Sequence, residues 1–267
     1  MTVSWVRRCW GEERGTTALT LLWFMLAALF FAFCLQALLA VYIAHQQLRT
    51  AADAAALATT RAIADLLPAA VEEEARERVD RVLSDPEANE EIEERIAELE
   101  EAQEACVADP LCVPLTPREV EERIKDIKVA AYRSAFGRLY GGSLSWQMAE
   151  RIVEGTWVDA PPHEKRDELI PDDRDLGCLV RRTAAGQRTL ILAEAERLAR
   201  LNGADLEPAR VRLIDDQGQN YVEVSRRVKP PVAAWLFPEH NYPKLVVSNR
   251  VHLQRVGTRT PQYSPGC

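Results

Sequence analysis

Residues 16–44 read TTALTLLWFMLAALFFAFCLQALLAVYIA, and this stretch contains no Asp, Glu, Lys or Arg. A helix that crosses a hydrocarbon core of ~30 Å needs about 20 predominantly apolar residues. The stretch is longer than that, and a helical backbone satisfies its own hydrogen bonds in lipid. We therefore predict a transmembrane helix over residues 16–44, which places every later residue on one side of a membrane.

Two other uses of the apolar stretch fit its sequence less well. A cleaved signal peptide has an apolar region of about 7–15 residues, and this stretch is roughly twice as long. A lipoprotein signal needs small residues before its cysteine, whereas Cys34 follows Phe33. A permanent anchor is the interpretation that the stretch favours.

The arginines around the anchor favour a cytoplasmic N-terminus. Three of them (Arg7, Arg8 and Arg14) precede the stretch and two (Arg49 and Arg61) follow it. Positive charge is enriched on the cytoplasmic side of membrane helices. We expect residues 1–15 in the cytoplasm and the bulk of the chain outside the cytoplasmic membrane.

The composition is that of a folded protein that does not bind nucleic acid. The chain has 267 residues, of which 47% are hydrophobic and 28% charged, with a net charge of −8. Nucleic-acid-binding domains are usually basic. The acidic residues are concentrated between residues 72 and 104, where they indicate a solvated surface.

The six cysteines agree with an exported domain. Cys106 and Cys112 flank a short Asp-Pro loop that a disulfide can close. Cys178 and Cys267 would then pair by elimination, with four free cysteines as the alternative. Neither pair has the C-x2-C spacing of a zinc site.

The region from residue 45 to residue 155 reads as a series of helices. The membrane helix is expected to continue to Leu67, because residues 45–67 are rich in Ala and Leu, and Pro68 should end or kink it. Two helices follow, over residues 69–83 and 86–106. The next helix begins at Thr116-Pro117 with Glu119 in capping-box spacing, and a shorter one covers residues 143–153.

The last part of the chain predicts a small mixed domain. Residues 156–184 are charged and contain prolines, and we expect an exposed loop. Residues 185–267 then show a helix over 185–201, strands over 210–214 and 221–228, a short apolar helix or turn over 230–237 and a strand over 244–256. The predicted fold is therefore α+β, with a long N-terminal transmembrane helix, a helical region and a small antiparallel sheet in the order α-β-β-α-β.

The flanks of the membrane helix resemble a known family. Glu13-Arg14-Gly15 precedes the helix, and residues 49–58 read RTAADAAALA. This combination is similar to the N-terminal region of the bacterial tight-adherence (Tad or Flp) pilus-assembly proteins of the TadE/TadG-like group. The resemblance covers about the first sixty residues and implies Gly15, Arg49, Ala52 and Asp53 as family-motif positions.

One departure from the family pattern narrows what the resemblance implies. Processed pseudopilins are cut after a glycine and carry Glu at the fifth residue of the mature chain, a position that Thr20 would occupy here. The resemblance therefore implies an uncleaved, TadG-like anchored component. No D-x-S-x-S adhesion motif is present, so metal-dependent adhesion is not expected.

The sequence contains no catalytic motif. It has no G-x-S-x-G, no H-E-x-x-H and no phosphate-binding glycine loop. We expect no catalytic or metal site and no cofactor, because the four histidines (His45, His163, His240 and His252) are scattered.

Three classes of function remain, of which a structural role in pilus assembly is favoured. That role implies partners among the membrane proteins of the apparatus, with Gln36 as a candidate interhelical contact and an oligomer as one arrangement. A membrane-tethered extracytoplasmic sensor or ligand-binding module is the alternative. An enzyme is third.

Overall fold

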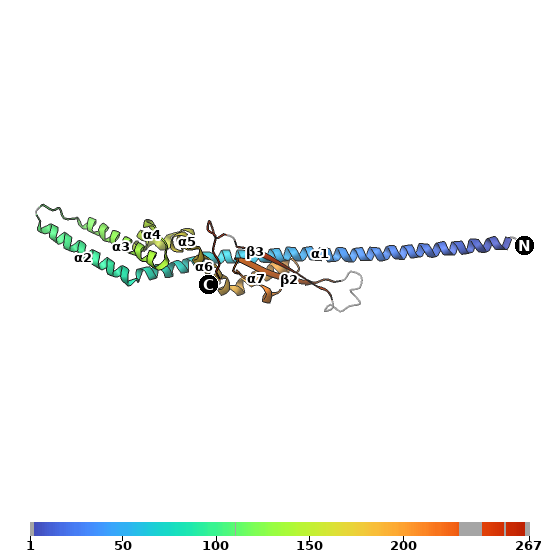
Figure 1. Ribbon diagram of the computed structural model, residues 1–267. Helices are drawn as coiled ribbons and strands as arrows, with labels where there is room; N and C mark the ends of the chain where they lie inside the picture. The colour runs from blue at the N-terminus through green and yellow to red at the C-terminus, as the bar shows by residue number, and fades with distance from the viewer. Residues whose placement is uncertain (1–2, 110, 230–241, 254, 265–267) are drawn as a thin grey trace. The chain divides into compact units, whose positions relative to one another are not determined.

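The structure is a computed structural model that describes residues 3–109, 111–229, 242–253 and 255–264, with side chains described from residue 17 on. Most of the described residues are helical, and a small three-stranded antiparallel sheet lies near the C-terminus (Figure 1). The α+β class predicted from the sequence is therefore confirmed.

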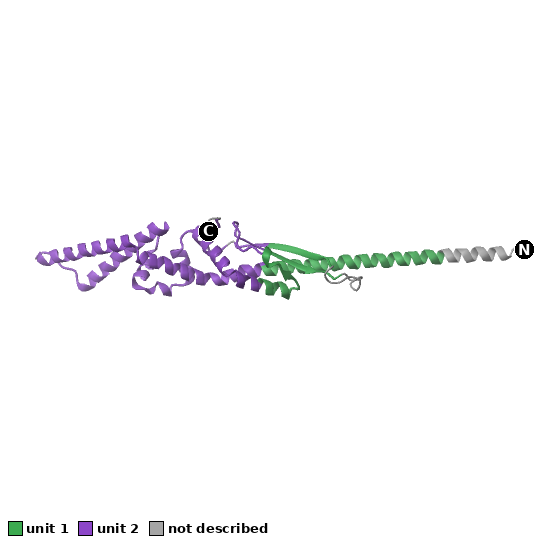
Figure 2. Cartoon of the chain, turned by 90° about the horizontal axis from the view of Figure 1, so that it is seen from below, with its two compact units in different colours: residues 1–55, 195–210, 222–249 green, residues 56–194, 211–221, 250–267 purple. Residues whose placement is uncertain are grey.

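The chain divides into two compact units that do not follow the order of the sequence (Figure 2). Unit 1 comprises residues 1–55, 195–210 and 222–249. Unit 2 comprises residues 56–194, 211–221 and 250–267. Helix α1 contributes to both units, because its residues up to 55 belong to unit 1 and its later residues belong to unit 2.

Helix α1 runs from Val3 to Leu83, which is longer than the sequence predicted. It begins before residue 16 and continues through Pro68, where we expected an end or a kink. The residues on either side of the proline explain the continuation. Leu67 and Val71 are both buried in the same hydrophobic cluster, which holds the helix in place. Tertiary packing outweighs the loss of one backbone hydrogen bond.

Local capping explains the next helices. Helix α2 (Pro86–Ala108) begins with a proline, and the carboxylate of Asp85 accepts a hydrogen bond from the backbone of Ala88. Helix α3 (Pro117–Tyr140) has the predicted capping box between Thr116 and Glu119. Helix α4 (Trp146–Glu154) and the short 3-10 helix η1 (Thr156–Asp159) follow, and α2 and α3 contact each other as a hairpin.

The expected loop over residues 156–184 is wrong. This segment forms η1, α5 (Pro162–Leu169) and most of α6 (Asp173–Gly186). Its charges suggested exposure, but Lys165 is 2% exposed and its ammonium group pairs with the carboxylate of Glu72. Apolar residues between the charges complete the burial: Leu169, Ile170 and Leu176. Ion pairs with distant residues thus turn a polar sequence into part of the core.

The sheet differs from its prediction in the first strand. Helix α7 (Arg188–Leu201) leads into β1 (Asp205–Leu206), which pairs antiparallel with β2 (Gln219–Arg227), and β3 (Lys244–His252) follows β2 in the sheet. The strand expected over residues 210–214 is reduced to one isolated bridge between Arg212 and Tyr221. A turn precedes β2 and is closed by a hydrogen bond from the amide of Gly218 to the carbonyl of Asp215. The short helix expected over residues 230–237 lies outside the described residues.

Unit 2 holds two hydrophobic clusters. One lies under α3, α4 and η1 and contains Phe136, Met148 and Trp157. The other joins α1 to α6, α7 and the segments next to the sheet, and contains Ile63, Ile191 and Leu253. Unit 1 has its own buried residues, which α1 contributes together with α7 and β2, and which include Leu48, Ala52, Ala195 and Val224.

Candidate functional site

The first candidate site is the exposed apolar part of α1. Its large side chains project into the surroundings over residues 19–43, and Trp23, Phe30 and Leu38 are each about two-thirds exposed. Ala44 is the first buried residue among the described side chains, and the side chain of Leu48 is 0% exposed. Among the described residues, α1 is the one helix that is long and apolar enough to cross a membrane, by length and composition.

Gln36 lies on this exposed stretch. Its side chain is exposed and makes no hydrogen bond to any residue that the structure describes. An amide in hydrocarbon is costly unless it finds a partner, and a neighbouring helix can supply one. The residue that the sequence singled out is thus accessible to another protein.

The motif positions after the apolar stretch lie against the sheet of unit 1. The asparagine side chain of Asn249 in β3 donates a hydrogen bond to the carboxylate of Asp53 at 2.7 Å. The guanidinium group of Arg226 in β2 donates to the side chain of Gln47 at 2.8 Å. Both contacts place the sheet beside α1, as Figure 1 also shows.

Small side chains make this approach fit. Four alanines of the motif are 0% exposed: Ala51, Ala52, Ala55 and Ala56. Arg49 is exposed, and Gly15 lies within α1, before the residues whose side chains are described. The alanine stripe therefore packs on later elements of the same chain, and the motif has a structural role in unit 1.

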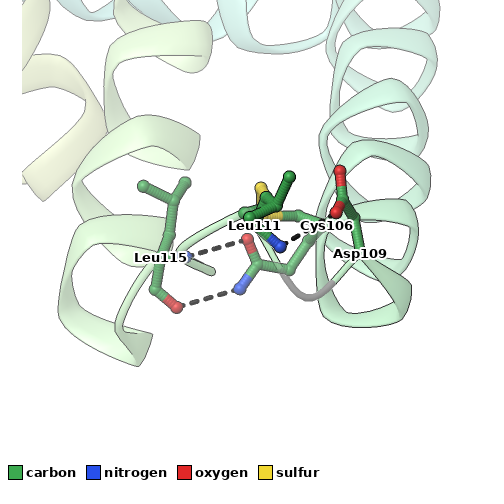
Figure 3. The surroundings of a disulfide bond; sticks show 6 residues. Cys106, Asp109, Leu111 and Leu115 are labelled. Atoms are coloured by element: carbon green, nitrogen blue, oxygen red, sulfur yellow. Dashed lines mark hydrogen bonds between the residues drawn. A yellow bond between two sulfur atoms is a disulfide. The ribbon is translucent and has the colours of Figure 1, made fainter.

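The second candidate site is the loop between α2 and α3, which a disulfide closes. The structure joins Cys106 and Cys112, whose Cα atoms are 5.2 Å apart (Figure 3). The side chain of Gln103 spans the same loop, donating to the carbonyl of Leu115 and accepting from its amide. The carboxylate of Asp109 accepts from the amide of Leu111. The disulfide and the two hydrogen bonds of Gln103 therefore both constrain the loop.

This cross-linked loop and the residue just after it present exposed apolar side chains. Val107 is 69%, Leu111 92% and Val113 87% exposed. Helix α2 is acidic next to them, with exposed carboxylates at Glu100, Glu101 and Glu104. A fixed loop that presents apolar side chains loses little conformational entropy when a partner covers it, so it is suited to protein contact.

We expect the disulfide to order this loop more than it supports the whole protein. In the chain-entropy model, a ring of this size stabilises the folded state by about 2 kcal/mol. The variant Cys106→Ser should raise amide hydrogen exchange in residues 107–115 while peptides from α6 keep their protection. The control is Ser145→Ala, which removes the cap of α4 and should leave hydrogen exchange in residues 107–115 unchanged. Unchanged exchange in the loop would contradict the prediction.

Cys178 is also disulfide-bonded. Cys267, the partner expected by elimination, lies outside the described residues. Cys34 is a free, exposed thiol on the apolar stretch.

No catalytic or metal constellation was found in the part of the chain that the structure describes. No group of three or more His, Cys, Asp and Glu side chains is placed to hold a metal ion there. His163 and His252 lie on separate elements, and His240 is outside the described residues.

A buried network of charges was missed in the sequence. Arg78 is 5% exposed, and its guanidinium group donates to the carboxylates of Glu74 at 2.9 Å and Asp175 at 2.7 Å. It also donates to the carbonyl of Leu169 and lies 4.5 Å from the centre of the Tyr140 ring. All of these partners lie within unit 2, so the network is structural.

Comparison with known proteins gives no match. No protein-family model matches the chain, and no curated protein or solved structure matches it.

Proposed function

We propose that the protein is a single-pass, membrane-anchored component of a bacterial tight-adherence pilus assembly or a related secretion apparatus, with a structural role. The observation that carries the proposal is the change along α1. The apolar side chains over residues 19–43 are exposed, and burial begins at Ala44, where later segments of unit 1 pack on the helix. Lipid around residues 19–43 would account for the exposed apolar side chains there and for the absence of protein cover before Ala44 among the described residues.

The proposed location is the cytoplasmic membrane, with the N-terminus inside and the chain after the apolar stretch outside. The arginine distribution around the apolar stretch supports this orientation. Disulfides at Cys106 and Cys178 agree with an oxidising compartment. The resemblance of residues 13–15 and 49–58 to pilus-assembly proteins supports the kind of apparatus.

The partners in this proposal are other membrane proteins of the apparatus, bound in part through Gln36. An amide that is exposed on an apolar helix gains a hydrogen bond when a second helix covers it, worth on the order of 1 kcal/mol. The cysteine-closed loop, with Leu111 and Val113 exposed, offers a second contact outside the membrane.

A photo-crosslinking experiment in the native host tests the proposal. A photoreactive residue at position 36 should crosslink the full chain to another membrane protein, and the chain should resist extraction with alkaline carbonate. Position 38 is the matched control, because it lies about 200° further around the helix. Crosslinks to lipid alone from position 36, or release by carbonate, would refute the assembly role or the anchor, respectively.

A further inference from the structure

A cavity of about 380 Å³ opens in unit 2 between α1, α5 and the segment after β3. Small-molecule sites commonly have volumes of this order. Its apolar lining comes from Ile63, Leu67, Val71, Leu253 and Val256. No pattern in the sequence indicates this cavity, because the residues that line it are far apart along the chain.

One buried cation borders the cavity. Arg166 is 8% exposed, and two of its nitrogens, Nε and Nη2, donate to the carboxylate of Asp167 at 2.8 and 3.0 Å. Its third nitrogen, Nη1, makes no hydrogen bond to any described residue. Gly257 leaves the space for it, because a Cβ there would come within 2.1 Å of Nη1. A buried guanidinium group thus keeps an unused donor at the cavity wall.

Two more basic side chains line the same cavity. Arg255 and His163 are exposed at its edge and form no ion pair within the described residues. No acidic side chain is among the lining residues. An apolar cavity with two arginines and no acidic residue in its lining complements a molecule with an apolar body and an anionic end.

We propose that this cavity binds a small amphiphilic carboxylate, meaning an apolar tail of alkyl or aryl character that carries one carboxylate. The tail lies against Ile63, Leu67 and Val256. The carboxylate accepts hydrogen bonds from Nη1 of Arg166 and from Arg255. The site goes beyond the assembly role, because membrane anchoring does not depend on it.

Three probes with the same body and different end groups test the proposal by titration calorimetry. The full chain in lipid nanodiscs is titrated with 4-phenylbutyrate, 4-phenylbutan-1-ol and 4-phenylbutylamine, with empty nanodiscs as the blank. We expect the carboxylate to bind about tenfold more tightly than the alcohol, because hydrogen bonds to charged groups are worth more than neutral ones. The ammonium probe should show no binding.

Two variants locate the site. Ala64→Trp places a large side chain on an exposed lining position of α1 and should abolish binding of the carboxylate and the alcohol. Arg255→Gln should reduce the preference for the carboxylate over the alcohol severalfold. Arg123→Gln, at an exposed position on α3, should leave binding unchanged and controls for net charge.

The proposal is overturned if the ammonium probe binds as well as the carboxylate, if carboxylate and alcohol bind equally, or if Ala64→Trp binds like the native chain. None of these outcomes bears on carbonate extraction or on crosslinks from position 36. Failure of the ligand site and failure of the assembly role are therefore distinguishable.

Discussion

The variant Arg78→Met should lower the free energy of unfolding of unit 2 by about 3–5 kcal/mol, the range for breaking a buried ion pair. Methionine keeps most of the volume of the arginine stem but removes the charge. The carboxylate of Glu74, which is 12% exposed, would retain only Arg182 at 2.8 Å. The carbonyl of Leu169 would lose a donor as well.

Hydrogen exchange measured on the full chain in nanodiscs can test this prediction. Peptides from α6 and from residues 70–83 should lose protection by the stated free energy. Arg76→Met is the matched control, because Arg76 lies on the same helix, is exposed and has no ion-pair partner within the described structure. Equal effects of the two variants would show that the network contributes nothing.

A double variant separates a missing charge from a missing side chain. Replacing Glu74 by Gln together with Arg78→Met removes the carboxylate that has lost one of its two partners. The double variant should be more stable than Arg78→Met alone, because neutral groups cost less to bury. If it is less stable, the loss comes from packing over Tyr140 and not from the stranded charge.

The pH dependence of the native chain should show the same network. Burial disfavours the charged form of Glu74, but the hydrogen bond and charge of Arg78, together with Arg182, outweigh it and lower the pKa of Glu74 below its ordinary value of 4.5. A lowered carboxyl pKa stabilises the fold above pH 4.5, and this contribution is lost as the pH falls through the folded pKa. The difference in the free energy of unfolding between the native chain and Arg78→Met should therefore become smaller as the pH falls.

The parts of the fold that were predicted from the sequence are those fixed by neighbouring residues. The start of α3 depends on Thr116, Pro117 and Glu119, which contact one another within one helical turn. The apolar stretch is recognisable for a similar reason, since its character depends on composition alone. Local interactions leave a local pattern, and a single sequence is enough to detect it.

The predictions that were wrong concern residues whose environment is set by residues distant in the sequence. Pro68 suggested a helix end, but its neighbours Leu67 and Val71 pack on residues more than a hundred positions later, such as Val180 and Leu253. The segment around Lys165 looked like a solvated loop because Glu72, the ionic partner of Lys165, lies 93 positions earlier in the chain. Charged residues indicate exposure only when they lack partners.

The candidate sites also divide into those with a local sequence pattern and those without one. The Cys106–Cys112 loop and Gln36 were named from sequence, because a short cysteine spacing and a polar residue in an apolar stretch are local features. The cavity beside Arg166 could not be named, because it joins residues 63–71 of α1 to Arg255 and Gly257 near the other end of the chain. Nothing in the sequence of either segment requires the other.

The variant Ala52→Phe should destabilise unit 1 by about 3 kcal/mol or more, the upper part of the range for overpacking a filled core. Ala52 is 0% exposed, and Ala51, Ala55 and Ala56 beside it are equally buried. A phenyl ring there would push the sheet away from α1 and separate Asn249 from Asp53, which are 2.7 Å apart.

The matched control for this variant is Ala54→Phe, at a half-buried position of the same helix. Hydrogen exchange in β2 and β3 of the full chain should rise strongly for Ala52→Phe and little for Ala54→Phe, while the protection of α3 and α4 stays unchanged in both. If both variants left β2 and β3 protected, the alanine stripe would not be a tightly packed contact. Because the stripe contains the motif position Ala52, a loss of protection confined to Ala52→Phe would give that motif a physical reason: small residues are needed where the sheet approaches α1.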